Sequence, residues 1–111
     1  MMEVKSKVWL EEKGELVFGV GKTTILKSIE ETGSINKAAK KMNMSYRRAW
    51  SYVVSIEKRI GQPLLIRVKG GKDGGGAVLT KYAKDLLNKF ENMEKEVEEF
   101  VNERYKTIFH Q

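Results

Sequence analysis

The sequence contains no cysteine and only one proline and one histidine. Without cysteine, the chain can form neither a disulfide nor a thiolate metal site. No apolar run approaches the ~18 residues that a membrane-spanning helix needs, and the N-terminal ten residues lack the small-residue cleavage site of a secretory signal. These absences exclude disulfide-stabilised, secreted and membrane-spanning classes, and they predict a soluble, cytoplasmic protein.

The residue types that enzymes gather in active sites are sparse as well. His110 stands alone near the C-terminus. The sequence offers no plausible pair of nucleophile and base, and no residues with the spacing of metal ligands. The stretch GVGKTT at 19–24 contains the Gly-Lys-Thr with which a nucleotide phosphate-binding loop ends. That motif also requires a glycine five positions before Gly21, where this sequence has Leu16. We therefore interpret the stretch as a turn into a helix, and we predict no enzyme activity, no cofactor and no metal.

Positive charge is concentrated in the middle of this 111-residue chain, which has a net charge of +6. Residues 34–89 carry thirteen lysines and arginines against three acidic residues, whereas residues 90–111 carry a local charge of −3. A basic block of this kind attracts polyanions and is typical of nucleic-acid binders, although an anionic membrane surface would attract it too. The length suits one compact domain.

Hydrophobic periodicity and turn residues predict the order of the elements. A short hairpin is expected around Lys13 and Gly14, and a second one is expected around a glycine-rich tip. Ser34, Ser45 and Thr80 are the expected N-caps of the last three helices, and Gly61 ends the longer helix of the middle pair. The expected helices cover residues 22–31, 34–43, 46–60 and 80–106, and the strands of the second hairpin cover residues 63–69 and 77–79.

The two middle helices follow each other so closely that the chain must turn sharply between them. The small Ala38 and Ala39 of the first allow the second to cross it closely, which is the pattern of a helix-turn-helix. In that motif, the start of the second helix enters the major groove. The candidates to reach base edges are Tyr46, Arg47, Trp50 and Ser51, while Arg48 and Lys58 are assigned to phosphates. For Trp50, partly buried packing is an equal alternative.

The tip of the second hairpin, residues 70–76, contains five glycines. Glycine lets a backbone approach another surface closely, and Arg67, Lys69 and Lys72 bring positive charge to this loop. We interpret it as a wing that lies against a groove or phosphate ribbon of DNA. The alternative is a plain flexible turn, although seven residues are more than a turn needs.

The last helix carries apolar residues at alternating spacings of four and three, which is a heptad seam. A solitary helix cannot hide these side chains in so small a domain, although the N-terminal segment could cover part of the seam, so the pattern predicts a homodimer. We divide the chain into a winged helix-turn-helix domain at residues 1–79 and a dimerisation helix at residues 80–111. The residues expected in the dimer contact are Leu86, Phe90, Met93, Val97 and Phe100.

Several motifs together resemble the N-terminal domain of the ModE family of molybdate-responsive transcription regulators. They are TGSI at 32–35, the following AAK and SYRRAW, and above all GGKDGGGAVLT leading into KYAKDLL. The resemblance covers about residues 21–90, and it extends more loosely to the DNA-binding domain of LysR-type regulators. The glycine-rich stretch is its most specific part, because the helix-turn-helix core is shared widely.

The resemblance implies a mainly α fold with a small antiparallel β wing, a winged helix-turn-helix. It also implies a homodimer on a palindromic operator in double-stranded DNA, upstream of transport or metal-cofactor genes. By resemblance, base reading falls on Ser45, Tyr46, Arg47 and Trp50, and wing contacts on Gly71 and Lys72. Full-length ModE proteins carry C-terminal oxyanion-binding domains, whereas this chain ends about thirty residues after the glycine-rich loop, in an acidic helix. We therefore expect no small-molecule effector site in this chain. A winged-helix module that docks an acidic protein partner is the alternative function.

Overall fold

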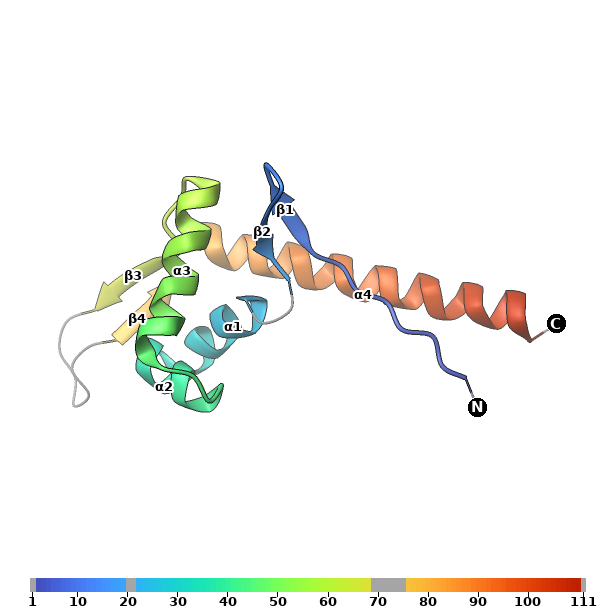
Figure 1. The fold of residues 1–111 in the computed structure, drawn as a ribbon, viewed down its shortest axis with the longest axis horizontal. Helices are drawn as coiled ribbons and strands as arrows, with labels where there is room; N and C mark the ends of the chain where they lie inside the picture. The colour runs from blue at the N-terminus through green and yellow to red at the C-terminus, as the bar shows by residue number, and fades with distance from the viewer. Residues whose placement is uncertain (1, 20–21, 69–75, 111) are drawn as a thin grey trace.

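The computed structural model describes residues 2–19, 22–68 and 76–110, with the side chains of residues 22–24 left out. A four-helix chain with two separate two-stranded antiparallel sheets fills these ranges (Figure 1). The elements are β1 (Leu10–Glu12), β2 (Glu15–Phe18), α1 (Lys22–Thr32), α2 (Ile35–Lys41), α3 (Tyr46–Ile60), β3 (Leu65–Val68), β4 (Gly76–Leu79) and α4 (Lys81–Phe109). Their order confirms the mainly α fold with a small antiparallel wing.

The hairpin β1–β2 forms where the sequence predicts it. Lys13 and Gly14 both have positive φ angles, 52° and 82°, which is the backbone of the two-residue turn that matches the twist of an antiparallel pair. The second strand then brings Val17 and Phe18 into the core, at 5% and 0% exposure. The hairpin is thus anchored by its return strand.

The end of that strand explains one glycine of GVGKTT. A Cβ atom on Gly19 would lie 2.8 Å from the Cβ of Trp9, so only glycine fits where the hairpin strands come this close. The helix α1 begins at Lys22, and residues 20–21 lie outside the described residues. The glycine therefore serves the packing of the hairpin against itself, in agreement with the structural interpretation of this stretch.

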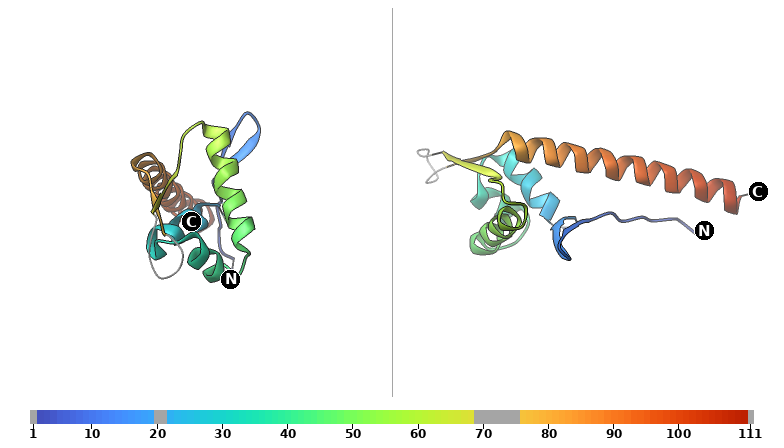
Figure 2. Two further views of the ribbon diagram at one scale, coloured as in Figure 1. Left: turned by 90° about the vertical axis from the view of Figure 1, so that its left-hand side faces the viewer. Right: turned by 90° about the horizontal axis from the view of Figure 1, so that it is seen from above.

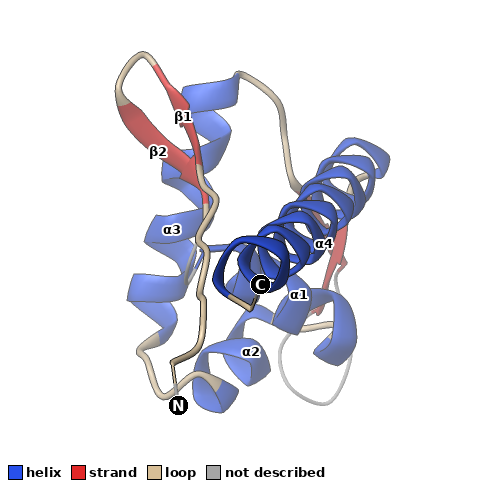
Figure 3. Ribbon diagram, turned by 90° about the vertical axis from the view of Figure 1, so that its right-hand side faces the viewer, coloured by secondary structure: helices blue, strands red, loops and turns tan. Residues whose placement is uncertain are grey.

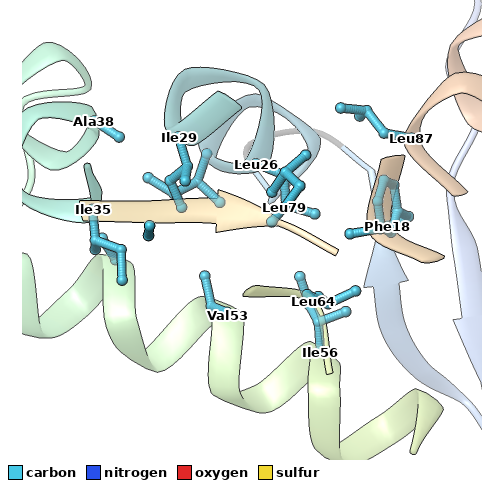
Figure 4. Close-up of a cluster of buried hydrophobic side chains, with 14 of the residues drawn as sticks. Phe18, Leu26, Ile29, Ile35, Ala38, Val53, Ile56, Leu64, Leu79 and Leu87 are labelled. Atoms are coloured by element: carbon cyan, nitrogen blue, oxygen red, sulfur yellow. The ribbon is translucent and has the colours of Figure 1, made fainter. Parts of the chain in front are cut away.

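The core lies where α1, α2, α3, β4 and the start of α4 meet. Figure 4 shows Leu26 and Ile29 of α1 above Val53 and Ile56 of α3, with Leu79 of β4 between the two helices. Helical spacing produces this arrangement, because positions three and four apart share one face. On α3, Ala49, Val53 and Ile56 form one apolar stripe, and all three side chains are fully buried.

Three N-caps hold the helix starts in place as expected. The side-chain oxygens of Ser34, Ser45 and Thr80 accept hydrogen bonds from the backbone N–H groups of Lys37, Arg48 and Ala83, each at 3.1 Å. Such bonds satisfy donors that a helix leaves without an internal partner. At the other end of α3, Gly61 adopts the left-handed conformation with φ 70° and closes the helix.

The helix α4 extends far beyond the rest of the fold and sets the long axis of a molecule measuring 60 × 30 × 22 Å. Figures 1 and 2 show the N-terminal segment running beside it, with both termini at the same end. The Tyr105 hydroxyl donates to the Met2 carbonyl at 3.2 Å, which joins the two. Viewed along α4, the hairpin β1–β2 and the strand pair β3–β4 lie on opposite sides of it (Figure 3).

Candidate nucleic-acid interface

The turn between α2 and α3 fixes the angle of the helix pair. Ala38 and Ala39 are 0% and 1% exposed, and their small side chains let the two helices approach closely. The backbone then reverses through Asn43, which has a φ of 58°, a left-handed conformation that asparagine tolerates better than most residues. The Met44 N–H donates to the Ala39 carbonyl at 2.9 Å and locks the turn. This is the geometry of a helix-turn-helix.

The first turns of α3 present a polar and aromatic face to solvent. Ser45, Tyr46, Arg47, Arg48 and Ser51 are all exposed, whereas Ala49 and Val53 on the opposite face are fully buried. Because the core stripe faces inward, the candidate base-reading side chains share one outer surface. The structure therefore exposes the proposed residues at the start of α3 together, apart from the half-buried Trp50.

The two arginines on this face differ in their surroundings. The Arg48 Nε donates to the Tyr52 hydroxyl at 3.1 Å, and its guanidinium lies 5.6 Å from the centre of the Tyr52 ring. Within the described ranges, Arg47 has no hydrogen-bond or ion-pair partner. A planar guanidinium with unused donors can bind the O6 and N7 acceptors of guanine in bidentate fashion.

Trp50 is half-buried and packs on the edge of the core. Its outer face is covered by a strand residue, since the Arg67 guanidinium carbon lies 4.2 Å from the centre of the Trp50 ring. The Arg67 Nη2 also donates to the Tyr46 hydroxyl at 3.1 Å. Of the two interpretations of Trp50, packing is the one with direct contacts.

No sequence signal links Arg67 to this pair, because Arg67 and Tyr46 stand 21 positions apart and lie on different elements. The expected role of Arg67 was that of a wing residue. The structure adds a contact with the start of α3, which only the packing of β3 against that helix reveals.

The stem of the wing, β3 and β4, is antiparallel as expected, and the structure pairs Leu65 with Leu79 and Arg67 with Ala77. The Ala77 N–H donates to the Gly33 carbonyl at 2.9 Å, which ties the stem to the junction of α1 and α2. The proposed wing contacts Lys69, Gly71 and Lys72 lie outside the described residues. The stem alone is therefore described, and it is held by both the helix junction and the core.

Lysines on α2 continue the positive surface beside α3. Lys37, Lys40 and Lys41 are exposed, and Lys41 donates to the Glu31 carboxylate at 2.8 Å. That hydrogen bond and the lysine charge lower the pKa of Glu31 below its ordinary value. Lys41 is thus paired within the protein.

Lys58 lies elsewhere than the phosphate assignment requires. It is eleven residues along α3 from Arg47, roughly 16 Å at the helical rise of ~1.5 Å per residue. There it lines a shallow hollow with Glu12 and Glu15 of the hairpin, next to Arg59, whose Nε donates to Glu15 at 2.9 Å. Hairpin acids occupy this end of α3, so Lys58 does not share the surface of Arg47.

The expected dimer residues divide into two groups. Phe90 is 2% exposed and packs on Phe18 with ring centroids 5.4 Å apart, so its own chain already covers it. The expectation that Phe90 contacts a partner is corrected accordingly. The sequence put it on the seam because the core face and the seam share their first turns. Leu86, Met93 and Val97 are half-buried, and Phe100 is 64% exposed.

The core also crosses the expected division at residues 79 and 80. Ala83 and Leu87 of α4 are 0% and 1% exposed and belong to the same cluster as Leu79. The first turns of α4 therefore belong to the folded unit of the helix-turn-helix, and the rest of the helix projects from it.

The described part of the chain supports neither a metal site nor a membrane-spanning helix. No group of three or more histidine, aspartate or glutamate side chains there is arranged to hold a metal ion. None of its helices combines the length and the apolar character that crossing a bilayer requires.

A family model and several relatives match this arrangement. The bacterial regulatory helix-turn-helix protein model of the lysR family matches residues 22–84. The transcriptional regulator ModE of Haemophilus influenzae is 45% identical over 71 residues, which is 64% of this chain and 28% of that protein. The DNA-binding transcriptional dual regulator ModE of Escherichia coli K12 is 32% identical over 90 residues, 81% of this chain and 34% of that protein. The chain thus spans about a third or less of these relatives.

Solved structures agree on the fold. The chain in the crystal structure of the CbnR_DBD-DNA complex superposes with a TM-score of 0.57 at 17% identity, covering 78% of this chain and 92% of that one. Full-length LysG from Corynebacterium glutamicum gives a TM-score of 0.58 at 19% identity, covering 78% of this chain and 29% of that one. The winged helix arrangement is confirmed by both.

Proposed function

Because the chain belongs to the lysR family of bacterial regulatory helix-turn-helix proteins, we propose that it binds double-stranded DNA and regulates transcription. The observation that carries the proposal is the outer face of α3, where the Ser45 cap, Tyr46, Arg47 and Ser51 are exposed at the start of the helix. The major groove is about 12 Å wide and admits one α-helix. The family supports this function over docking of an acidic protein partner.

Each side chain of this face has a proposed role. Arg47 reads guanine, while Ser45, Tyr46 and Ser51 are placed to contact neighbouring base edges or phosphates. Arg48 contacts phosphate. Lys69, Gly71 and Lys72 of the wing approach the backbone of the duplex, where the glycines permit close contact.

The working form in this proposal is a homodimer joined by the projecting part of α4. The contact uses Leu86, Met93, Val97 and Phe100, the seam residues that the core does not bury. Two-fold symmetry places the recognition helices one DNA turn apart, ~34 Å, which requires an inverted-repeat operator. One ModE relative is named a transcriptional regulator and another a molybdenum transport protein, and together these names support control of genes for molybdate or metal transport. The protein acts in the cytoplasm without enzyme activity.

Selection of bound duplexes from random DNA tests the proposal, and an inverted-repeat consensus is the expected result. Arg47→Ala should cost about 1–3 kcal/mol on that consensus and relax the preference at one position of each half-site. Lys72→Ala should weaken binding almost equally on all duplexes. Arg104→Ala, the same substitution near the far end of α4, is the control and should leave binding unchanged. Equal, sequence-blind losses for Arg47 and Lys72 would contradict the groove assignment.

A further inference from the structure

Arg67 joins the wing stem to the recognition helix by two contacts at once. Its guanidinium carbon lies over Trp50, 4.2 Å from the ring centre, and its Nη2 donates to the Tyr46 hydroxyl at 3.1 Å. Tyr46 and Trp50 are one helical turn apart on α3. A single strand residue therefore fixes both aromatic side chains of the surface proposed to meet DNA.

Only arginine can make this pair of contacts together. A guanidinium is planar, stacks on an aromatic face and still points N–H donors outward in its own plane, whereas the ammonium of lysine is a compact, strongly hydrated charge. Tyr46 is 43% exposed, and the Arg67 contact restricts the rotamers of a side chain that would otherwise lose that freedom on binding DNA. Ordering it in the free protein lowers the cost of recognition.

The strand that carries Arg67 is itself held in place. Arg67 is paired in register with Ala77, whose N–H donates to the Gly33 carbonyl at the α1–α2 junction. Where Gly76 approaches that carbonyl, an added Cβ would lie 3.0 Å from the oxygen. The helix junction therefore holds β4, β4 holds β3 by strand pairing, and Arg67 of β3 contacts the start of α3.

We propose that Arg67 is a positioning residue. Its contacts from β3 hold the Tyr46 and Trp50 side chains in the orientation that sequence-specific recognition needs. This inference rests on the proposed DNA-binding function and assigns to Arg67 a role other than contact with phosphate. A phosphate contact needs only positive charge, whereas the positioning role needs the planar guanidinium. Arg67→Lys separates the two roles because it keeps the charge.

The experiment compares Arg67→Lys with the parent in a Trp9→Phe background, so that Trp50 is the only tryptophan. The probes are the duplex that the parent selects from random DNA and a shuffled duplex of the same composition. Without the Arg67 contacts, the Tyr46 and Trp50 side chains would have to be immobilised on binding, which should weaken binding to the selected duplex by about 5- to 30-fold. Binding to the shuffled duplex and the slope of affinity against salt should stay unchanged, since that slope counts neutralised phosphates.

Two further measurements make the result specific. In the free protein, acrylamide should quench Trp50 fluorescence more strongly in Arg67→Lys, because the guanidinium no longer covers the ring. Tyr46→Phe removes only the hydroxyl acceptor and should give a smaller loss on the selected duplex alone. Arg59→Lys is the matched control: it is the same charge-conserving substitution on the same helix, where the Arg59 Nε donates to Glu15 of the hairpin at 2.9 Å, and it should leave binding to both duplexes unchanged.

Unchanged binding and quenching in Arg67→Lys would overturn the positioning role. An equal loss on both duplexes with a shallower salt slope would overturn it too, because that is the behaviour of a phosphate contact. If the parent selects no duplex, the proposed function itself fails. The quenching of Trp50 in the free protein then still decides whether Arg67 covers the ring.

Discussion

Replacing Phe90 by alanine should unfold the monomer rather than separate a dimer. The ring is 2% exposed and contacts Phe18, which is fully buried at the end of β2. This contact joins α4 to the N-terminal hairpin within the core that they share with the helix-turn-helix. The substitution therefore removes a side chain on which two segments depend.

The size of the effect follows from the burial and the ring contact. Truncation of a buried phenylalanine to alanine costs about 3–5 kcal/mol, a range that includes the cavity left behind. The tilted pair of rings, with centroids 5.4 Å apart, places the loss in the upper part of that range, since such pairs add about 0.5–1.5 kcal/mol beyond area burial. Domains have total stabilities of only about 5–15 kcal/mol, so much of the stability is lost.

Urea unfolding followed by circular dichroism at several protein concentrations measures this loss, and sedimentation equilibrium measures self-association. Phe100→Ala is the matched control, because it is the same substitution ten residues later on a side chain that is 64% exposed. It should leave the folding of the monomer within about 0.5 kcal/mol of the parent and weaken self-association in the proposed dimer.

The opposite pattern would refute this reasoning. If Phe90→Ala kept the unfolding free energy of the parent but dissociated a dimer, the ring would serve a partner and not its own core. If Phe100→Ala dissociated nothing, the projecting seam would have no role in assembly.

Three smaller perturbations test local features. Gly19→Ala should destabilise the fold, because the new Cβ would lie 2.8 Å from the Cβ of Trp9; a thermal midpoint at or above that of the parent would contradict the close approach. Ser34→Ala removes the α2 cap and should cost about 1 kcal/mol in chemical unfolding, and no change would mean that water replaces the cap. Lys41→Ala should raise the pKa of Glu31 towards its ordinary value, measured by carboxyl NMR titration. Because the folded pKa is lowered, the pairing stabilises the protein above the unfolded pKa and is lost as the pH falls through the folded one; an unmoved pKa would contradict the pairing.

The local features of the fold could be predicted because single residues determine them. Ser45 and Thr80 cap helices through their own side chains, and Gly61 ends α3 because glycine adopts the left-handed conformation readily. The positions of the helices then followed from apolar spacing, and with them the outer face of α3. Predicting this part of the site requires only the hydrophobic periodicity of one helix.

What could not be predicted depends on contacts between distant elements. The seam of α4 and its core face run through the same first turns, so periodicity alone cannot tell that Phe90 meets Phe18 while Phe100 remains exposed. The contact of Arg67 with Trp50 is of the same kind, since it depends on how β3 crosses α3. Sequence spacing carries no information on such crossings.

The packing of Phe90 also affects which spacing between half-sites the proposed dimer can bind. If the first turns of α4 hinged freely on the domain, two joined helices would let the recognition helices drift apart, and half-site spacing would be variable. Ala83, Leu87 and Phe90 instead bury these turns in the same core that holds α3, and Lys27 of α1 pairs with Glu91 at 3.5 Å on the next turn. Each protomer then carries its recognition helix at a fixed angle to the projecting seam. A dimer built on that seam should therefore accept one half-site spacing and reject duplexes in which a base pair is inserted between the half-sites, because each inserted pair rotates one half-site by about a tenth of a turn.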